Sequence, residues 1–590
     1  MRLLLIYLAA LFLCLPVKGQ NVAGLSDTSR TFTVAKWQKY LNLPISESAK
    51  LTKAEILVNG KFADYIEIKL ASDKPDYWVY FNTAPYQDKT ITVEISPRNP
   101  ESDDPTVRLT EKQNELKRIK AVLQMMELDS TFPGQDSLYK EQERPQVHFT
   151  SRRGWLNDAN GLVFYKGEYH LYYQHNPYGW GWGNMHWGHA VSSDLIHWHE
   201  LPDALYPVMV GDAAFSGSAV VDTNNTSGFR KNGIDPIIAF YTSTGRGECM
   251  KISYDSGRTF IDYEGNPLIK HLGRDPKVFW YEPGKHWVMV LYDYGSRRKM
   301  DLGQDAEISQ TLIYTSSDLK NWILQSGIPG FFECPDFFQL PVEGEPGKSK
   351  WVMNDASGRY IVGDFDGRKF SIDQNLKKYD YCGNFYASQT YNNMPDKRRI
   401  QIGWGRDISY PGMPFNQPML FPTELKLKKA FDGFRLCPTP IKEIASLHEN
   451  PQIIKNKIIS GNTAVGVPVN GDAVHVIAEF EIGDPEPFGL NIMGYKIEYN
   501  NRMGEFSTSS QHKSITTNYV KPGSYNFKIE AIVDKNIIEV FVNDGEIYYP
   551  ASFDSKKTGR IDAYYRGGDD QKVILKRLEV YQLKSIWNNE

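Results

Sequence analysis

The sequence predicts an all-β protein: a five-bladed β-propeller followed by a C-terminal β-sandwich, preceded by a small N-terminal β domain and one linking helix. Two observations predict the propeller. An apolar strand pattern returns five times, roughly 50–65 residues apart, which is the length of a four-stranded blade. It occurs at residues 169–173, 237–241, 287–291, 351–353 and 400–404. In addition, SSDLIHW at 192–198 returns almost literally as SSDLKNW at 316–322, with a looser copy at 254–260.

Length and charge narrow the class of protein. The chain has 590 residues, which is too long for one hydrophobic core, so several domains are expected. The formal net charge is −4 and no basic tract is present, which argues against nucleic acid as a partner. Aromatic residues make up 13% of the chain, and flat aromatic faces are common in both β-rich proteins and sugar-binding sites.

Residues 1–19 have the pattern of a secretory signal. Arg2 precedes an apolar run at 3–15, and Val17-Lys18-Gly19 offers a cleavage site. Cys14 raises the alternative of a lipoprotein, but the Leu-Phe-Leu before it lacks the usual small residues. No later stretch is long and apolar enough to span a membrane. We therefore expect secretion across the inner membrane into the periplasm, with a cell-surface lipoprotein or an extracellular protein as alternatives.

Residues 20–109 are expected to form the N-terminal β domain, because 66–70 and 91–95 alternate apolar and polar residues. Residues 110–145 are expected to be a helix and a linker. Thr110 and Gln113 form a capping-box pattern for a helix over 111–128, with Leu116, Ile119 and Leu123 on one face. We expect a structural or docking role for this part.

The propeller is expected over residues 146–430, a connector over 431–445 and the sandwich over 446–590. In the last segment, the turn Asn543-Asp544-Gly545-Glu546 separates two apolar strands and predicts a hairpin. The cysteines of the mature chain are scattered, so free buried thiols are expected; these are Cys249, Cys334, Cys382 and Cys437.

Asp158 lies in the stretch WLNDANG at 155–161, which has the composition of a turn and runs directly into an apolar strand. A carboxylate on a loop braced by a strand is well held for chemistry. The amides of Asn157 and Asn160 could hydrogen-bond the Asp158 carboxylate and keep it ionised. An ordinary turn with a solvated aspartate is the alternative.

Two more carboxyl groups lie at suggestive places on later repeats. Asp275 follows Arg274 and precedes Pro276, and the arginine is expected to keep it ionised. Glu333 is flanked by phenylalanines, which would favour its neutral form if they pack nearby. Strands around a propeller axis can bring such groups together, and glycoside hydrolysis needs two carboxyl groups with different roles. Each group by itself is more often structural than catalytic.

The three stretches together resemble glycoside hydrolase family 32, the invertases, inulinases and levanases. WLNDANG resembles its WMNDPNG signature, Arg274-Asp275-Pro276 its RDP, and Glu333-Cys334 its EC, all in family order. Further agreements lie at 174–177, 187–190, 215–218 and 384–387. The resemblance covers about residues 146–590, and three separate motifs in order make it specific.

The resemblance implies retaining cleavage of β-D-fructofuranosyl units. Asp158 would be the nucleophile, Glu333 the general acid and base, and Asp275 the transition-state stabiliser. By the same analogy, the fructose subsite would be lined by Asn157, Gln174, Trp182, Phe215, Ser216, Arg274 and Trp404. It implies no metal and no cofactor. The partner would be a fructan or fructo-oligosaccharide, and a monomer is favoured.

The sequence also departs from the family pattern. Leu156 and Ala159 replace Met and Pro in the signature, Asn384 stands where Asp is frequent, and Thr423 where Arg is frequent. The loss of proline could loosen the loop, and any role for an acid at 384 is in doubt. The N-terminal part resembles an accessory domain found before fructan hydrolases of gut-type bacteria.

Other interpretations remain open at this stage. Six of the twelve histidines fall between 170 and 199, which raises a metal site, although HExxH is absent. A non-catalytic sugar-binding propeller and an inverting hydrolase of another furanoside are further alternatives. Within the fructosidase interpretation, exo action is preferred over endo action. Fructosyl transfer and the choice among levan, inulin and sucrose stay open.

Overall fold

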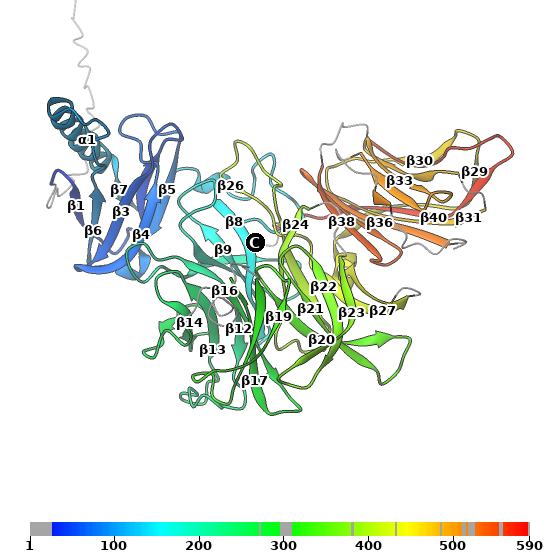
Figure 1. Ribbon diagram of the computed structural model, residues 1–590. Helices are drawn as coiled ribbons and strands as arrows, with labels where there is room; N and C mark the ends of the chain where they lie inside the picture. The colour runs from blue at the N-terminus through cyan, green and yellow to red at the C-terminus, as the bar shows by residue number, and fades with distance from the viewer. Residues whose placement is uncertain are drawn as a thin grey trace, which may run out of the picture. The chain divides into compact units, whose positions relative to one another are not determined.

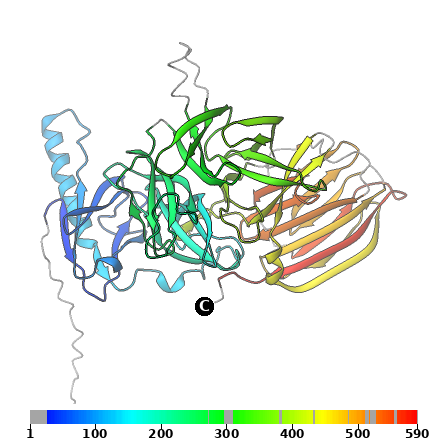
Figure 2. The ribbon, with the colours of Figure 1, turned by 90° about the horizontal axis from the view of Figure 1, so that it is seen from below.

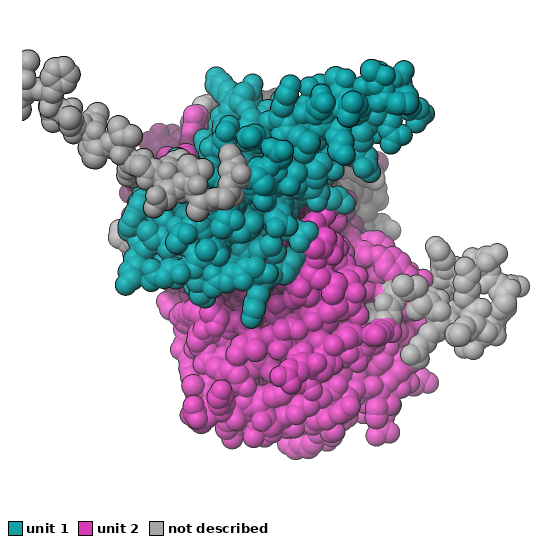
Figure 3. All heavy atoms as spheres, turned by 90° about the vertical axis from the view of Figure 1, so that its left-hand side faces the viewer, with its two compact units in different colours: residues 1–62, 69–131 teal, residues 63–68, 132–590 magenta. Residues whose placement is uncertain are grey.

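The computed structural model describes residues 26–270, 273–294, 309–378, 383–430, 433–483, 486–509, 515–516, 526–553 and 559–587. The predicted signal at 1–19 and Cys382 lie outside these residues. The chain divides into two compact units, which Figure 3 shows in teal and magenta. Unit 1 comprises residues 1–62 and 69–131, and unit 2 comprises residues 63–68 and 132–590.

Unit 1 contains most of the N-terminal β domain. One sheet has the order β1 (Ser29–Thr33), β6 (Thr90–Ser96), β3 (Thr52–Val58) and β4 (Lys61–Ile68). The other has the order β5 (Tyr77–Asn82), β2 (Tyr40–Ile45) and β7 (Glu127–Asp129), and a short 3₁₀ turn lies at Ala84–Tyr86. Ile91, Val93 and Ile95 are buried and alternate with less buried neighbours, as the alternation predicted.

Helix α1 spans Pro105–Met125 and begins earlier than predicted. Its N-cap is Asp104, whose carboxylate accepts hydrogen bonds from the N–H groups of Thr106 (2.8 Å) and Val107 (3.2 Å). The predicted cap Thr110 lies inside the helix and donates to the Thr106 carbonyl instead. Asp followed by Pro is the stronger start signal, because proline lacks the N–H that the first turn cannot pair. In the described part of the chain, no helix is long and apolar enough to cross a bilayer.

The central part of unit 2 consists of antiparallel strand groups, cyan to yellow-green in Figure 1. The first sheet has the order β11 (His199–Leu205), β10 (His186–Ser192), β9 (Glu168–Asn176), β8 (Gly154–Tyr165) and β26 (Phe415–Asn416). The second comprises β12 (Ala214–Val221), β13 (Ile237–Ser243), β14 (Gly247–Ser253) and β15 (Ile261–Asp262). The third comprises β16 (Gly273–Tyr281), β17 (His286–Asp293), β18 (Gln310–Ser316) and β19 (Ile323–Pro329).

A fourth, larger sheet completes this part. Its order is β23 (Phe370–Lys378), β22 (Arg359–Phe365), β21 (Ser349–Asn354), β20 (Asp336–Glu343), β27 (Thr423–Ala430), β25 (Ile400–Gly405) and β24 (Phe385–Thr390), with β28 (Gly433–Pro440) paired to β27. β20 and β27 pair in parallel at Val342–Leu427, which joins two groups of strands into one sheet. The all-β prediction is confirmed, whereas the blade number stays a prediction.

The first strands of these groups lie next to one another. β12 packs against both β8 and β16, and β24 packs against both β8 and β20. All of these strands are apolar over most of their length; Val163, Ala219, Val278 and Phe338, for example, are buried. The beginnings of neighbouring first strands are thereby brought together, although they are far apart in sequence.

The C-terminal strands form two six-stranded sheets, which Figure 2 shows in yellow to red. One comprises β29 (His448–Ser460), β40 (Lys572–Leu583), β31 (Val474–Ile482), β36 (Asn526–Asp534), β37 (Ile537–Val542) and β38 (Ile547–Ser552). The other comprises β30 (Ala464–Pro468), β39 (Arg560–Tyr565), β32 (Phe488–Ile492), β33 (Tyr495–Asn500), β34 (Glu505–Thr508) and β35 (Ile515–Thr516). Their buried side chains form one shared core, as expected for a sandwich. A 3₁₀ helix at Lys442–Leu447 precedes β29.

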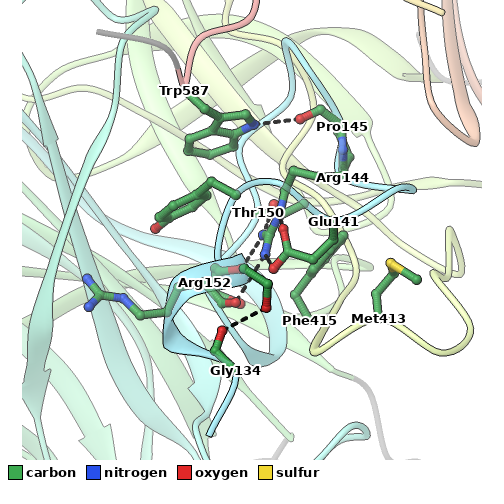
Figure 4. A network of polar contacts seen from close by, with 12 residues as sticks. Gly134, Glu141, Arg144, Pro145, Thr150, Arg152, Met413, Phe415 and Trp587 are labelled. Atoms are coloured by element: carbon green, nitrogen blue, oxygen red, sulfur yellow. Dashed lines mark hydrogen bonds and ion pairs between the residues drawn. The ribbon is translucent and has the colours of Figure 1, made fainter. Parts of the chain in front are cut away.

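The segment before the first sheet is fixed by one arginine, shown in Figure 4. Arg144 is fully buried; it pairs with Glu141 (2.7 Å) and donates to Thr150 Oγ1 (2.7 Å). Its guanidinium also lies 3.6 Å above the ring of Phe415. The indole N–H of Trp587 donates to the Pro145 carbonyl (2.6 Å). This segment, which includes a 3₁₀ turn at Gln135–Ser137, is therefore well anchored, although its composition suggested a linker.

His148 joins the start of the first sheet to the C-terminal sandwich. Its Nδ1 lies 3.0 Å from Asp534 Oδ2, and its Nε2 lies 2.8 Å from Glu539 Oε1. Asp534 also accepts the backbone N–H of Val147 (2.7 Å), and Glu539 accepts that of Phe421 (2.6 Å). All three charged side chains are fully buried. We call His148, Asp534 and Glu539 the histidine clasp.

Candidate active site

The candidate site lies at the beginnings of the first strands, and it is built from β-bulges. The strand register shifts between Leu156 and Ala159 in β8, and between Ala214 and Gly217 in β12. It shifts again between Arg274 and Lys277 in β16, and between Tyr386 and Gln389 in β24. A bulge bends a strand and redirects the side chains on it. Corresponding bulges therefore turn polar residues from four strands toward one place.

Asp158 sits in the first of these bulges. The predicted turn is wrong, because residues 154–165 form one continuous strand, β8. Ser216 Oγ donates to Asp158 Oδ2 (2.7 Å), and Asn157 Nδ2 donates to Oδ1 (3.1 Å). Asn160, the other amide that we expected to hold Asp158, is fully buried and bonds to Gln174 instead.

Asp275 and Arg274 point to the same place although they are adjacent. Asp275 has φ +67°, a left-handed conformation that is rare for residues other than glycine and is often found at functional sites. Arg274 Nε lies 3.4 Å from Asp275 Oδ2. The hydroxyl of Thr242 accepts the Asp275 N–H (3.0 Å) and donates to the fully buried Glu248 (3.0 Å). Thr242 and Glu248 thus hold the unusual backbone.

Glu333 lies immediately before β20, where it is bound by two side chains. Arg274 forms an ion pair with Glu333 Oε2, and the hydroxyl of Tyr386 donates to Oε1. The flanking phenylalanines do not enclose this carboxyl group as expected. Phe331 and Phe337 pack into a separate core, and Phe332 is exposed and packs on Tyr292. The polar partners therefore define the surroundings of Glu333.

Cys334 connects two of the three carboxyl groups. Its N–H donates to Asp275 Oδ2 (3.0 Å), and its Sγ lies 3.4 Å from Asp158 Oδ2 and 3.5 Å from Asp275 Oδ2. Burial and the nearby carboxylates raise the pKa of this thiol well above its usual value. Cys334 is therefore a neutral S–H donor, and its φ of +51° aims both its N–H and its side chain at the site.

Asp275 and Glu333 share the guanidinium of Arg274, whereas Asp158 is held by Ser216, Asn157 and Cys334. Burial raises the pKa of Asp275 to about 8; Arg274 opposes the shift, whereas Asp158 and Glu333 add to it. Burial also raises the pKa of Asp158, against the hydrogen bond from Ser216. The expectation that Arg274 keeps Asp275 fully ionised is therefore wrong. With more negative than positive charge in a buried cluster, a proton is retained at neutral pH.

Several predicted substrate-binding residues lie close to these carboxyl groups. Asn157, Ser216 and Arg274 contact Asp158 or Glu333 directly. Phe215 precedes Ser216, and its ring meets that of Trp182 edge-to-face at 6.2 Å. Trp182 is 65% exposed, so most of its indole is free to contact a ligand.

Trp404 and Gln174 have different surroundings. Trp404 is buried and packs edge-to-face against Tyr386 (5.9 Å) and Trp155 (6.0 Å), which places it behind the Glu333 partner. Gln174 is also buried, and its Nε2 donates to the Ala214 carbonyl (2.9 Å). It ties β9 to β12 beside the site and has little surface for a substrate.

Sequence reasoning missed three residues of the site: Tyr386, Cys334 and Thr242. Tyr386 and Cys334 both lie in stretches that match the family motifs, and this match is the sequence signal that could have identified them. Burial and the charge of Glu333 raise the pKa of Tyr386, so its hydroxyl remains a donor. Thr242 lies in an ordinary apolar strand and had no comparable signal.

The departures from the family pattern have simple local structures. Asn384 Nδ2 donates to the Arg406 carbonyl (2.7 Å), and Thr423 is buried where its hydroxyl accepts from Gln401 (3.4 Å).

The histidine-rich stretch has no metal-like arrangement within the described ranges, where no group of three or more His, Cys, Asp or Glu could hold an ion. His170 and His189, for instance, bond to each other (3.0 Å).

Comparison with known sequences agrees with this geometry. Residues 148–440 match the glycosyl hydrolases family 32 N-terminal domain, and residues 443–582 match the glycosyl hydrolases family 32 C terminal domain. Residues 26–145 match a domain of unknown function, DUF4980. The levanase of Bacillus subtilis is 38% identical over 504 residues, which cover 76% of this chain and 72% of the levanase. Invertase 1 of Saccharomyces cerevisiae is 31% identical over 480 residues, or 69% of this chain and 88% of the invertase.

Comparison with solved structures leads to the same family. The crystal structure of exo-inulinase from Aspergillus awamori superposes with a TM-score of 0.66 at 27% identity, covering 76% of this chain and all of that chain. By sequence motifs, domain matches and fold, the chain belongs to glycoside hydrolase family 32.

Proposed function

We propose that this glycosidase cleaves terminal β-D-fructofuranosyl residues from fructans with retention of configuration. The observation that carries the proposal is the convergence of Asp158, Asp275 and Glu333 around Arg274 and Cys334. Retaining glycosidases need one carboxylate to attack the anomeric carbon and one carboxylic acid to protonate the leaving oxygen. Levanases, inulinases and invertases among the relatives support β-fructosides as the substrate class.

In this proposal Asp158 is the nucleophile. One of its oxygens bonds to the anomeric carbon of the fructosyl unit while the glycosidic bond breaks and Glu333 gives its proton to the leaving oxygen. Water then attacks the same carbon, its proton passes to Glu333, and the Asp158 carboxylate is released. Ser216 and Asn157 hold the attacking carboxylate in position.

Asp275 and Arg274 would act on charge rather than form a covalent bond. Asp275 lies beside the reacting carboxylates, where a carboxylate can hold sugar hydroxyls and stabilise the developing positive charge. Arg274 pairs with both Asp275 and Glu333. Its positive charge can therefore stabilise the Glu333 carboxylate each time Glu333 has given up its proton. Tyr386 donates to Glu333 and fixes its orientation.

Exo action is the proposed mode, with fructose as the product. It is supported by the exo-inulinases, one of which, from Aspergillus niger, is 30% identical over 76% of this chain and 96% of that protein. The test is a product time course on levan and on inulin. Fructose as the sole early product would support exo action, a ladder of oligosaccharides would replace it with endo action, and no release from any β-fructoside would refute the function.

The proposed setting is the periplasm, and the proposed state is a monomer. Relatives described as extracellular enzymes support export, and the pattern at residues 1–19 supports a cleaved signal. Cell fractionation with a periplasmic marker tests the location. Size-exclusion chromatography with light scattering tests the state, and a mass of twice the 67.5 kDa chain would contradict it.

A further inference from the structure

Residues 63–68, the larger part of β4, belong to unit 2 together with the catalytic strands. Residues 63–68 of β4 lie inside the region that matches the domain of unknown function. They are nevertheless grouped with unit 2, whereas the residues on both sides of them are grouped with unit 1. The polar bonds of these six residues explain this grouping and identify the segment that they hold.

Asp64 is the buried centre of these contacts. It has no exposed surface, and it accepts hydrogen bonds from the hydroxyl of Tyr178 (2.7 Å) and from Nε2 of His186 (3.1 Å). Burial opposes protonation of His186, but the charge and the hydrogen bond of Asp64 outweigh it and raise the imidazole pKa. A buried carboxylate is stable only with such donors, so the three side chains depend on one another.

Glu67 adds a second connection through its backbone. Its N–H donates to Asn184 Oδ1 (2.7 Å), and its carbonyl accepts from Asn184 Nδ2 (2.9 Å). The same Nδ2 reaches Asn176 Oδ1 (3.1 Å), while the Asn184 carbonyl accepts from His186 Nδ1 (2.6 Å). Asn184 thus bonds to β4 as an additional strand residue would, although its own backbone is in a loop with φ +43°.

The segment held in this way is the loop 177–185 between β9 and β10. Its other side is also fixed: Trp180 Nε1 donates to the Met413 carbonyl (2.9 Å), and the Trp180 carbonyl accepts from Asn416 (3.0 Å). Trp182, at the middle of the loop, is the side chain left exposed. Its ring meets Phe215, whose neighbour Ser216 bonds to Asp158.

We infer that residues 63–68 give the domain of unknown function a role in substrate recognition: they hold the 177–185 loop so that Trp182 forms a wall for the saccharide beside the carboxyl cluster. Asp64 is a positioning residue in this inference, since it acts through Tyr178 and His186 and does not touch the saccharide. An indole held in one orientation loses little entropy on stacking against a sugar ring, so it binds better than a mobile one. The inference rests on the proposed function, because the ligand of Trp182 is taken to be a β-fructoside.

The test compares Asp64→Ala and Tyr178→Phe in the full-length protein with a matched control. Glu94→Gln on β6 serves as control, because that side chain is an exposed carboxylate of the same domain. We expect Asp64→Ala to raise KM for a fructo-oligosaccharide about tenfold with kcat within about twofold, because a disordered wall weakens ground-state and transition-state binding alike. Tyr178→Phe should give a smaller rise in KM, and Glu94→Gln none.

A double-mutant cycle makes the test specific. If Asp64 acts through Trp182, then Asp64→Ala adds nothing to KM once Trp182→Ala is present; full additivity of the two effects would overturn the inference. Hydrogen exchange provides a readout without activity, and exchange in residues 177–185 should increase at least tenfold in Asp64→Ala. Unchanged exchange in that loop would also overturn it. If the wild-type protein released no fructose, the proposed function would fail, and the exchange result would still decide whether β4 holds the loop.

Discussion

The catalytic cluster and the histidine clasp are both groups of buried carboxylates, yet their electrostatics are opposite. In the clasp, Asp534 and Glu539 face one imidazole, and backbone N–H groups donate to both carboxylates. The result is a cation on His148, whose pKa is raised to about 9 by the hydrogen bonds and charges of the two carboxylates against the effect of burial. In the catalytic cluster, two of the three carboxyl groups share Arg274, and burial raises the pKa of Asp275 to about 8.

The difference lies in the backbone donors: Asp534 accepts the N–H groups of Gln146, Val147 and His148, whereas Asp275 accepts that of Cys334. A carboxylate that accepts several N–H bonds keeps its charge and serves the structure, whereas one with too few partners holds a proton that can move. The clasp uses its charges to join two parts of unit 2, and the active site keeps its carboxyl groups available for a substrate. The two clusters should therefore respond differently to substitution.

Asp158→Asn and Glu333→Gln should each lower kcat at least about 10³-fold, because each removes a group that makes or breaks a bond. Both variants should unfold at the wild-type temperature or slightly above it, since they remove charge from an undercompensated cluster. Steady-state kinetics and thermal melts measure the two effects. Near-normal fructose release by either variant would refute the assigned roles.

His148→Ala should lower stability instead of activity. We expect it to reduce the free energy of unfolding by about 3–5 kcal/mol, because it leaves two buried carboxylates without their cation. Urea denaturation gives the value. His197→Ala is the matched control: His197 also pairs with an aspartate, Asp194, but both side chains are partly exposed, so we expect a loss below about 1 kcal/mol. Equal losses of unfolding free energy in the two variants would show that the buried histidine contributes no more to stability than the exposed one.

The stability of the wild-type protein should fall as pH rises from 6.5 through about 9. The folded-state pKa of His148 lies above its ordinary value of 6.5, so the clasp contributes fully below pH 6.5 and is lost as the imidazole deprotonates near pH 9. The part of this change that belongs to His148 is about 3 kcal/mol, and the difference between the wild-type and His148→Ala proteins isolates it. Urea denaturation at a series of pH values measures this dependence. If the His148→Ala protein showed the same dependence, His148 would not be its cause.

Tyr386→Phe should lower kcat about tenfold, since it removes one hydrogen bond from Glu333 and no charge. Tyr172→Phe is the control, because the buried hydroxyl of Tyr172 has no hydrogen-bond partner in the described structure. That control should leave kcat unchanged. If Tyr386→Phe and Tyr172→Phe have the same kcat, the hydrogen bond from Tyr386 to Glu333 does not contribute to catalysis.

The sequence predicted the fold class and the family from motifs and repeats, because strand alternation and blade-length periodicity are local patterns. It did not predict the bulges, which depend on how each first strand pairs with its neighbour. Gly217 illustrates this: a Cβ there would lie 1.9 Å from the Phe240 carbonyl oxygen, a constraint that appears only when β12 and β13 are paired. For the same reason Asp158 resembled a turn residue. The protonation of Asp275 also depended on neighbours more than fifty residues away.

The contacts of Ile586 and Trp587 bring two distant parts of unit 2 together. Besides the bond from Trp587 to Pro145, the Ile586 N–H donates to the Gln146 carbonyl (2.8 Å), and Tyr139 stacks on Trp587. A segment whose two ends meet can be moved as a cassette, joined to other modules at one seam, or permuted there. The seam begins near Tyr139, upstream of the family match at 148, so a cassette cut at the family boundary would lose Tyr139 and Pro145, which contact Trp587.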